Sequence, residues 1–196
     1  MSTQLRLYSV SLATLDILVR PTNVWLAEEA RTQAAAVDAE GYVKGSRTVT
    51  EALEDILHDR PKDADAGNAY GHAWEIVIEQ LESKRFDFGP LKLGAQFLDE
   101  ASRELQSLGV PDDLTPLGFM YRTPFTGTPV ASDLPSIGHL PAPQVGALLT
   151  SYQAAEERLT NPNHKALAHT VITAAEEVVH RSEEHTSELQ SPIHIS

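Results

Sequence analysis

The sequence has 196 residues, no cysteine and a formal net charge of −13. The lack of cysteine excludes disulfides, thiolate nucleophiles and cysteine-based metal sites. The basic residues are few and scattered, which argues against binding of nucleic acid or an anionic membrane. No stretch approaches the roughly 18 apolar residues of a membrane span. Because residues 1–8 also lack the pattern of a signal peptide, we expect a cytoplasmic protein.

The N-terminal part is predicted to contain one strand and two helices. Apolar and polar residues alternate over 4–11, as in a β-strand. A short helix is expected over 12–20, with Pro21 as its stop, and a second helix over 23–37. The fold class that we predict is therefore α+β and mainly helical, with a small sheet that includes the N-terminal strand near 4–11.

A capping box predicts the start of the next helix. In such a box the Thr48 hydroxyl and the Glu51 carboxylate each bind a backbone N–H at the helix start. The helix should run to about His58. Its apolar residues fall on one stripe, which we expect to be buried: Leu53, Ile56 and Leu57.

The clearest amphipathic helix is predicted over 69–84. One face is apolar: Tyr70, Trp74, Val77 and Leu81, with Ala73 and Ile78 beside them. The opposite face is polar: His72, Glu75, Glu79 and Glu82. Phe86 and Phe88 follow in a brief extended stretch.

Three further helices are predicted over 94–108, 142–158 and 163–180. Gly109 followed by Pro111 is a typical helix stop. Asn161 or Asn163 is expected to cap the last helix.

Between these helices, residues 111–143 are rich in proline but also apolar and aromatic. We expect this Pro-rich segment to lie over the core, because a loop of this length is usually functional or packed on the domain. It also holds four polar side chains that we predict to bind a partner: Tyr121, Arg122, Asp133 and His139. An Arg beside aromatic residues is a common binding anchor. The alternative is a loop that pairs Arg122 with Asp133 and so caps itself.

The chain resembles a bacterial domain family of unknown function. The segment from Ala69 to Val77 resembles the Tyr-Gly-Tyr-Ala-Leu-Glu helix of that family. Residues 97–109 resemble its next helix, and residues 127–130 and 133–140 resemble its Pro-rich stretch. The sequence departs from the pattern at His72, where the family has an aromatic residue. The resemblance implies no activity.

The last sixteen residues, Arg181 to Ser196, resemble translated sequencing adapter. Back-translation of 181–191 gives one constant arm of the adapter, and Ile195–Ser196 gives the other arm in the same frame. Residues 192–194 fit the variable index between them. We therefore predict a single domain over 1–180, cut short near His180, and an artefactual tail over 181–196. The family's terminal apolar strand would be missing.

Two constellations could support an enzyme. His72, Glu75 and Glu79 share a helix face and could serve a hydrolase or hold a divalent metal. His139 with Asp133 is the second candidate pair. The alternative for the helix is a solvated face with local ion pairs. His164 and His169 are five residues apart and point in different directions, so they are not a metal-binding pair.

The sequence contains no phosphate loop, nucleotide fingerprint or nucleophile elbow, so we expect no cofactor. The leading hypothesis is a non-enzymatic protein-interaction or regulatory module that binds a protein partner with basic character. It would bind through the Pro-rich segment and the neighbouring helix over 69–84. The alternatives are the hydrolase or metal-dependent enzyme, and a small-ligand sensor with an aromatic pocket near Trp74 and Tyr121.

Overall fold

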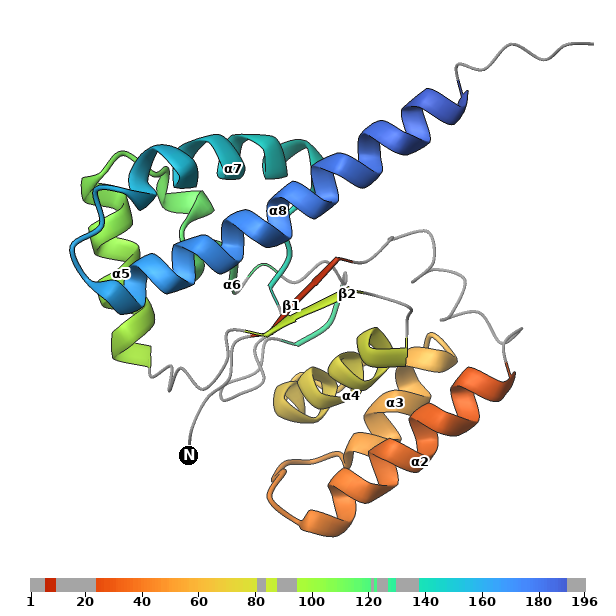
Figure 1. Cartoon of the computed structure of the whole chain (residues 1–196). Helices are drawn as coiled ribbons and strands as arrows, with labels where there is room; N and C mark the ends of the chain where they lie inside the picture. The colour runs from red at the N-terminus through yellow and green to blue at the C-terminus, as the bar shows by residue number, and fades with distance from the viewer. Residues whose placement is uncertain are drawn as a thin grey trace, which may run out of the picture. The chain divides into compact units, whose positions relative to one another are not determined.

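The computed structural model describes residues 6–9, 24–80, 84–87, 95–120, 122, 127–129 and 138–189 (Figure 1). The chain divides into two compact units, which are described separately. Residues 8–85 and 119–139 form the three-helix unit, named after its described helices. Residues 1–7, 86–118 and 140–196 form the α5–α8 unit. The single domain expected over 1–180 stays a prediction.

The three-helix unit is built from α2 (Val24–Glu40), α3 (Val49–Leu57) and α4 (Gly67–Gln80). Each of these helices packs against the other two (Figure 1). Ala30 and Ala34 are buried on α2, and such small side chains allow a neighbouring helix to approach closely. The larger core side chains come from α3 and α4: Leu53, Ile56, Leu57, Tyr70, Trp74, Val77 and Ile78. The apolar stripes predicted for these two helices are thus confirmed wherever their side chains are described.

The start of α3 is fixed from two directions. The predicted capping box is present: the Thr48 side chain accepts the Glu51 N–H at 3.1 Å, and Glu51 accepts the Thr48 N–H at 2.9 Å. Asp38, near the end of α2, accepts the N–H groups of Val49 at 2.7 Å and Thr50 at 3.0 Å. A carboxylate at a helix N-terminus satisfies free N–H groups and complements the helix dipole. The loop between α2 and α3 is therefore clamped at its far end.

The end of α3 requires an unusual backbone conformation. Asp59 has φ +48°, which is the left-handed region that glycine favours. The Arg60 N–H binds the Asp55 carbonyl at 2.8 Å, and the Asp59 N–H binds the Ile56 carbonyl at 3.3 Å. These two bonds form a Schellman motif with Asp59 in the position that is usually glycine.

The α5–α8 unit contains α5 (Ala95–Ser107), the 3₁₀ turn η1 (Asp112–Leu114), α7 (Ala142–Glu156) and α8 (Pro162–Leu189). Helix α6 (Pro116–Met120) lies across the boundary between the units. Helices α7 and α8 are antiparallel and pack along each other (Figure 1). The buried Tyr152 hydroxyl of α7 donates to the Leu114 carbonyl at 3.1 Å, which ties η1 to this helix pair.

The predicted helix signals of this unit are confirmed. Gly109 has φ +97° and ends α5 in a second Schellman motif, in which the Val110 N–H reaches the Leu105 carbonyl at 3.1 Å. Asn161, rather than Asn163, caps α8, because its side-chain oxygen accepts the Asn163 N–H at 2.9 Å. Pro162 follows as the first helical residue.

The predicted α+β class is wrong. Two four-residue segments, β1 (Arg6–Ser9) and β2 (Lys84–Asp87), pair with each other, but they provide no sheet layer for helices to cover. All buried side chains that the structure describes lie on helices and their connecting loops. The protein is helical because its amphipathic helices bury their apolar stripes against one another. Alternation over 4–11 reports a local extended preference and cannot show whether a sheet exists. The helix predicted over 12–20 lies outside the described residues.

Candidate functional site

The polar face of α4 carries one cluster that the sequence only partly predicted. His72 Nδ1 lies 3.7 Å from Glu75 Oε2, with both side chains partly buried. The ring of Tyr42, from the loop after α2, meets the His72 ring edge-on, with the ring centres 5.5 Å apart. Burial raises the pKa of Tyr42, and the charges of Glu40 and Glu75 raise it further. We call Glu40, Tyr42, His72 and Glu75 the Tyr42 patch.

Tyr42 distinguishes this patch from the other described surfaces. The residue is 50% exposed, and among the residues that the structure describes it is the large hydrophobic one that is exposed. The sequence analysis placed His72 and Glu75 on one face but missed Tyr42. The signal available in the sequence was a tyrosine directly after Gly41. In the structure Gly41 has φ +70° and turns the chain out of α2.

A second cluster links three elements of the α5–α8 unit. Glu104 of α5 accepts the Thr160 N–H at 2.8 Å and its hydroxyl at 2.7 Å, and its second oxygen meets His164 Nδ1 at 2.5 Å. Burial alone would raise the pKa of Glu104, but the bonds from Thr160 and His164 outweigh it and lower that pKa to about 2. The other ring nitrogen of His164 meets the Asn161 side-chain nitrogen at 3.3 Å.

The geometry of this second cluster is that of a structural joint. The Asn161 oxygen is used as the helix cap, so its amide nitrogen faces His164 Nε2. An amide nitrogen can only donate, which makes Nε2 the acceptor and Nδ1 the donor to Glu104. Both ring nitrogens are thereby engaged, and neither is left for a substrate or a metal. His169 is exposed and pairs with Glu156 at 3.0 Å, whereas His164 pairs with Glu104.

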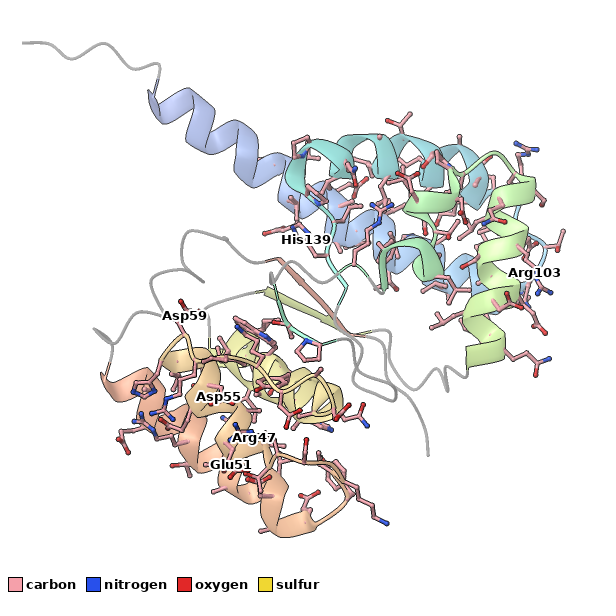
Figure 2. The ribbon with its side chains drawn as sticks, turned by 180° about the vertical axis from the view of Figure 1, so that it is seen from behind. Arg47, Glu51, Asp55, Asp59, Arg103 and His139 are labelled. Atoms are coloured by element: carbon pink, nitrogen blue, oxygen red, sulfur yellow. The ribbon has the colours of Figure 1, made fainter. Side chains whose placement is uncertain are left out.

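A third cluster joins α3 to α4 and includes residues of the loops before each of these helices. The buried Asp55 accepts the hydroxyl of the buried Tyr70 at 2.8 Å, and Arg47 lies 3.8 Å from the same carboxylate oxygen. The Tyr70 oxygen in turn accepts the Asp63 N–H at 3.1 Å. Arg47 and Asp55 are labelled in Figure 2. These bonds hold the loop that leads into α4.

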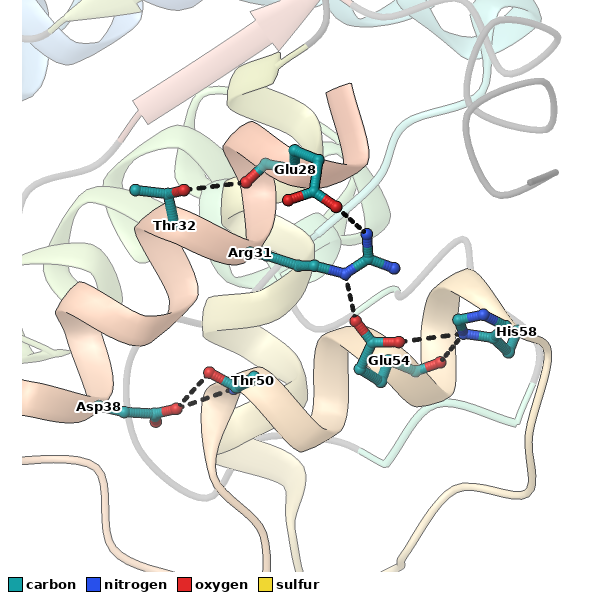
Figure 3. A network of polar contacts seen from close by, with 7 residues as sticks. All are labelled: Glu28, Arg31, Thr32, Asp38, Thr50, Glu54 and His58. Carbon is teal, nitrogen blue, oxygen red and sulfur yellow. Dashed lines mark hydrogen bonds and ion pairs between the residues drawn. The ribbon is translucent and has the colours of Figure 1, made fainter. Parts of the chain in front are cut away.

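The exposed side of α2 and α3 carries a network of ion pairs. Arg31 bridges Glu28 at 3.0 Å and Glu54 at 2.6 Å, and Glu54 also pairs with His58 (Figure 3). The hydrogen bond from Arg31 lowers the pKa of Glu54, against the opposing effect of burial. These ion pairs stabilise the contact between α2 and α3, and the charged groups in them are partners of one another.

The predicted partner-binding residues are described only in part. Arg122 is half-buried, and its N–H binds the Phe119 carbonyl at 3.1 Å. His139 is half-buried as well, and burial lowers its pKa. Tyr121 and Asp133 lie outside the described residues, so the pairing of Arg122 or His139 with Asp133 stays a prediction.

Part of the Pro-rich segment does lie on α4. The ring nitrogen of Trp74 donates to the Thr128 hydroxyl at 3.3 Å. This contact agrees with the expectation that the segment covers the core. It also engages the polar atom of Trp74, near which a sensor pocket was predicted.

Neither a metal site nor a membrane span is found in the part of the chain that the structure describes. No group of three His, Asp or Glu side chains there is arranged to hold a metal ion. His72 pairs with Glu75 alone, while Glu79 is exposed one turn further along α4. No described helix is both long and apolar enough to cross a membrane.

A family model matches residues 1–192, and its description is "Domain of unknown function (DUF7691)". The chain belongs to this family. The resemblance to a domain family of unknown function is therefore confirmed, while the bacterial origin stays a prediction. Comparisons of this DUF7691 chain with curated proteins and with solved structures found no match.

The DUF7691 match also bears on the predicted tail. It extends to residue 192, past the expected end near His180, and α8 runs to Leu189 as one helix. Neither observation identifies the origin of residues 181–196, which stays a prediction. Membership of DUF7691 assigns no activity.

Proposed function

We propose that this DUF7691 protein is a cytoplasmic, non-enzymatic interaction module that binds a protein partner with a basic surface. The binding surface comprises the polar face of α4, Tyr42 beside it and the Pro-rich segment. The observation that carries this proposal is the half-exposed Tyr42 beside His72 and Glu75. Tyrosine gives much contact area for little loss of conformational entropy and is enriched at the centres of protein interfaces.

The charge of the same unit supports a basic partner. Residues 27–80 contain twelve acidic and five basic residues. Two of the basic residues, Arg31 and Arg47, are paired with carboxylates of the unit. The remaining excess of negative charge attracts a positively charged protein and speeds its association.

The structural role of the other two clusters of ionisable side chains also favours a binding function over a catalytic one. Glu104 with His164 is a partly buried pair and Asp55 with Tyr70 a buried one, and the polar atoms of both pairs hold elements of the fold together. A general base needs a free lone pair directed at substrate. His164 Nε2 already accepts from Asn161.

The proposal is tested by affinity capture with the full chain from cells that carry the gene. An unrelated protein of equal length and charge serves as the control. We expect one basic protein to be enriched and to bind the purified chain at a defined stoichiometry by calorimetry. Enrichment no greater than with the acidic control would refute the proposal.

A hydrolase is the second candidate, and the proximity of His72 to Glu75 at 3.7 Å favours it. A panel of ester, amide and phosphate-ester substrates tests it directly. Turnover that disappears in His72→Gln but persists in Glu157→Gln, which changes an exposed residue elsewhere, would replace the binding proposal. The interaction module predicts no turnover in either protein.

A further inference from the structure

The loop that carries Tyr42 is held in a defined conformation. Gly41 adopts φ +70°, and its N–H binds the Asp38 carbonyl at 3.1 Å, which ends α2. The Asp38 carboxylate meanwhile holds the first turn of α3, including the Thr50 hydroxyl at 2.6 Å (Figure 3). One residue thus fixes both ends of the loop. A side chain that is already ordered loses little entropy when a ligand binds to it.

The surroundings of the Tyr42 ring are polar and negative. The neighbouring ring of His72 is mostly covered, with 14% of its side chain exposed, and Glu75 is 26% exposed. Glu40 is exposed at the end of α2, two residues before Tyr42. An exposed aromatic ring flanked by two carboxylates offers a π face and negative charge to the same ligand.

We propose that the Tyr42 patch binds one arginine side chain of the partner protein. The guanidinium stacks on the Tyr42 ring and pairs with the carboxylates of Glu40 and Glu75. Arginine fits better than lysine because its planar cation both stacks on an aromatic face and forms paired hydrogen bonds with a carboxylate. This inference rests on the proposed function and names the chemistry of its contact.

Two other carboxylates of the three-helix unit hold elements of the fold together. Glu54 is occupied by Arg31 and His58, and Asp38 is occupied by the start of α3. Within the part of the chain that the structure describes, Tyr42 is the exposed large hydrophobic residue, and its ring lies near the charges of Glu40 and Glu75.

The test is an NMR titration of the ¹⁵N-labelled full chain. The probe is a short amidated glycine–serine peptide with one central arginine, and the control peptide has uncharged citrulline at that position. We expect amide shifts in residues 40–44 and 72–75 with the arginine peptide and none with the citrulline peptide. Tyr42→Ala should weaken binding by about twofold to fivefold, the range for an exposed cation–π contact.

Two further variants separate ring from charge. Tyr42→Phe keeps the ring and should bind like the unmodified chain, whereas Glu75→Gln should bind more weakly. Glu157→Gln removes an exposed charge from the α5–α8 unit and is the matched control, which should change nothing. Shifts spread over all acidic surfaces, or equal affinity in Tyr42→Ala, would refute the arginine site.

The titration also separates failure of this inference from failure of the proposed function. If a captured partner binds Tyr42→Ala as tightly as the original chain, the arginine site is wrong and the interaction module stands. If the peptide binds at the patch but no partner is captured, the site is real and the proposed function is wrong.

Discussion

Replacement of Glu104 by glutamine tests the joint between α5 and the start of α8. The change keeps the shape of the side chain and removes its charge. Glu104 accepts three hydrogen bonds, two from Thr160 and one from His164, and lies beside the N-terminus of α8. Charge-assisted bonds of this kind are stronger than neutral ones, and the helix dipole favours the anion further.

The magnitude follows from the pKa. Folding lowers the pKa of Glu104 from its ordinary 4.5 to about 2, and each unit corresponds to about 1.4 kcal/mol. The full shift would give about 3 kcal/mol. Because 20% of the side chain is exposed and solvent screens the charge, we expect Glu104→Gln to lower the free energy of unfolding by about 2 kcal/mol at pH 7.

The pH dependence has a definite sign. A carboxyl with a lowered pKa in the folded state stabilises the protein above its unfolded pKa and loses that contribution as pH falls toward the folded value. The difference between Glu104→Gln and the original chain should therefore be constant above about pH 5.5 and shrink between pH 4.5 and 2.

Hydrogen exchange measured by mass spectrometry is the suitable assay. Both tryptophans, Trp25 and Trp74, belong to the three-helix unit, so fluorescence does not report on α5 and α8. Peptides from α5 and from the start of α8 should exchange faster in Glu104→Gln. Glu100→Gln, on the exposed side of α5, is the control. Unchanged protection in Glu104→Gln, or a difference that persists at pH 2, would refute the reasoning.

Three other predictions concern local structure and the end of the chain. Asp59→Gly should raise the free energy of unfolding by about 0.5–1 kcal/mol, because glycine adopts φ +48° without strain. Urea unfolding followed by tryptophan fluorescence measures this change, and a loss of stability would contradict the Schellman geometry. Thr48→Ala should lower that free energy by about 1 kcal/mol in the same assay by removing the capping box, whereas Thr32→Ala, on the exposed side of α2, should have a smaller effect. When the source locus is sequenced through codon 180, we expect the codons that follow to differ from those for residues 181–196. The same codons at that place would show that the tail is native.

From the sequence alone we predicted helices over the regions of α2, α3, α4, α5, α7 and α8, but not α6 or the extension of α8 to Leu189. The Thr48–Glu51 box and the stop at Gly109 were identifiable because each satisfies backbone groups within a few residues, whereas the cap of α8 was left open between Asn161 and Asn163. The burial of the stripes on α3 and α4 followed from their periodicity.

Only the tertiary structure decided the contacts between distant residues. Asp38 caps α3 from eleven residues away, and Glu104 meets His164 across sixty. The contact between Tyr42 and His72 also joins residues far apart in the sequence. The helical class, in place of the predicted α+β class, likewise depends on which elements pack together. Local periodicity records which face of a segment is apolar, but the choice of what covers that face is made by packing among elements far apart in the chain.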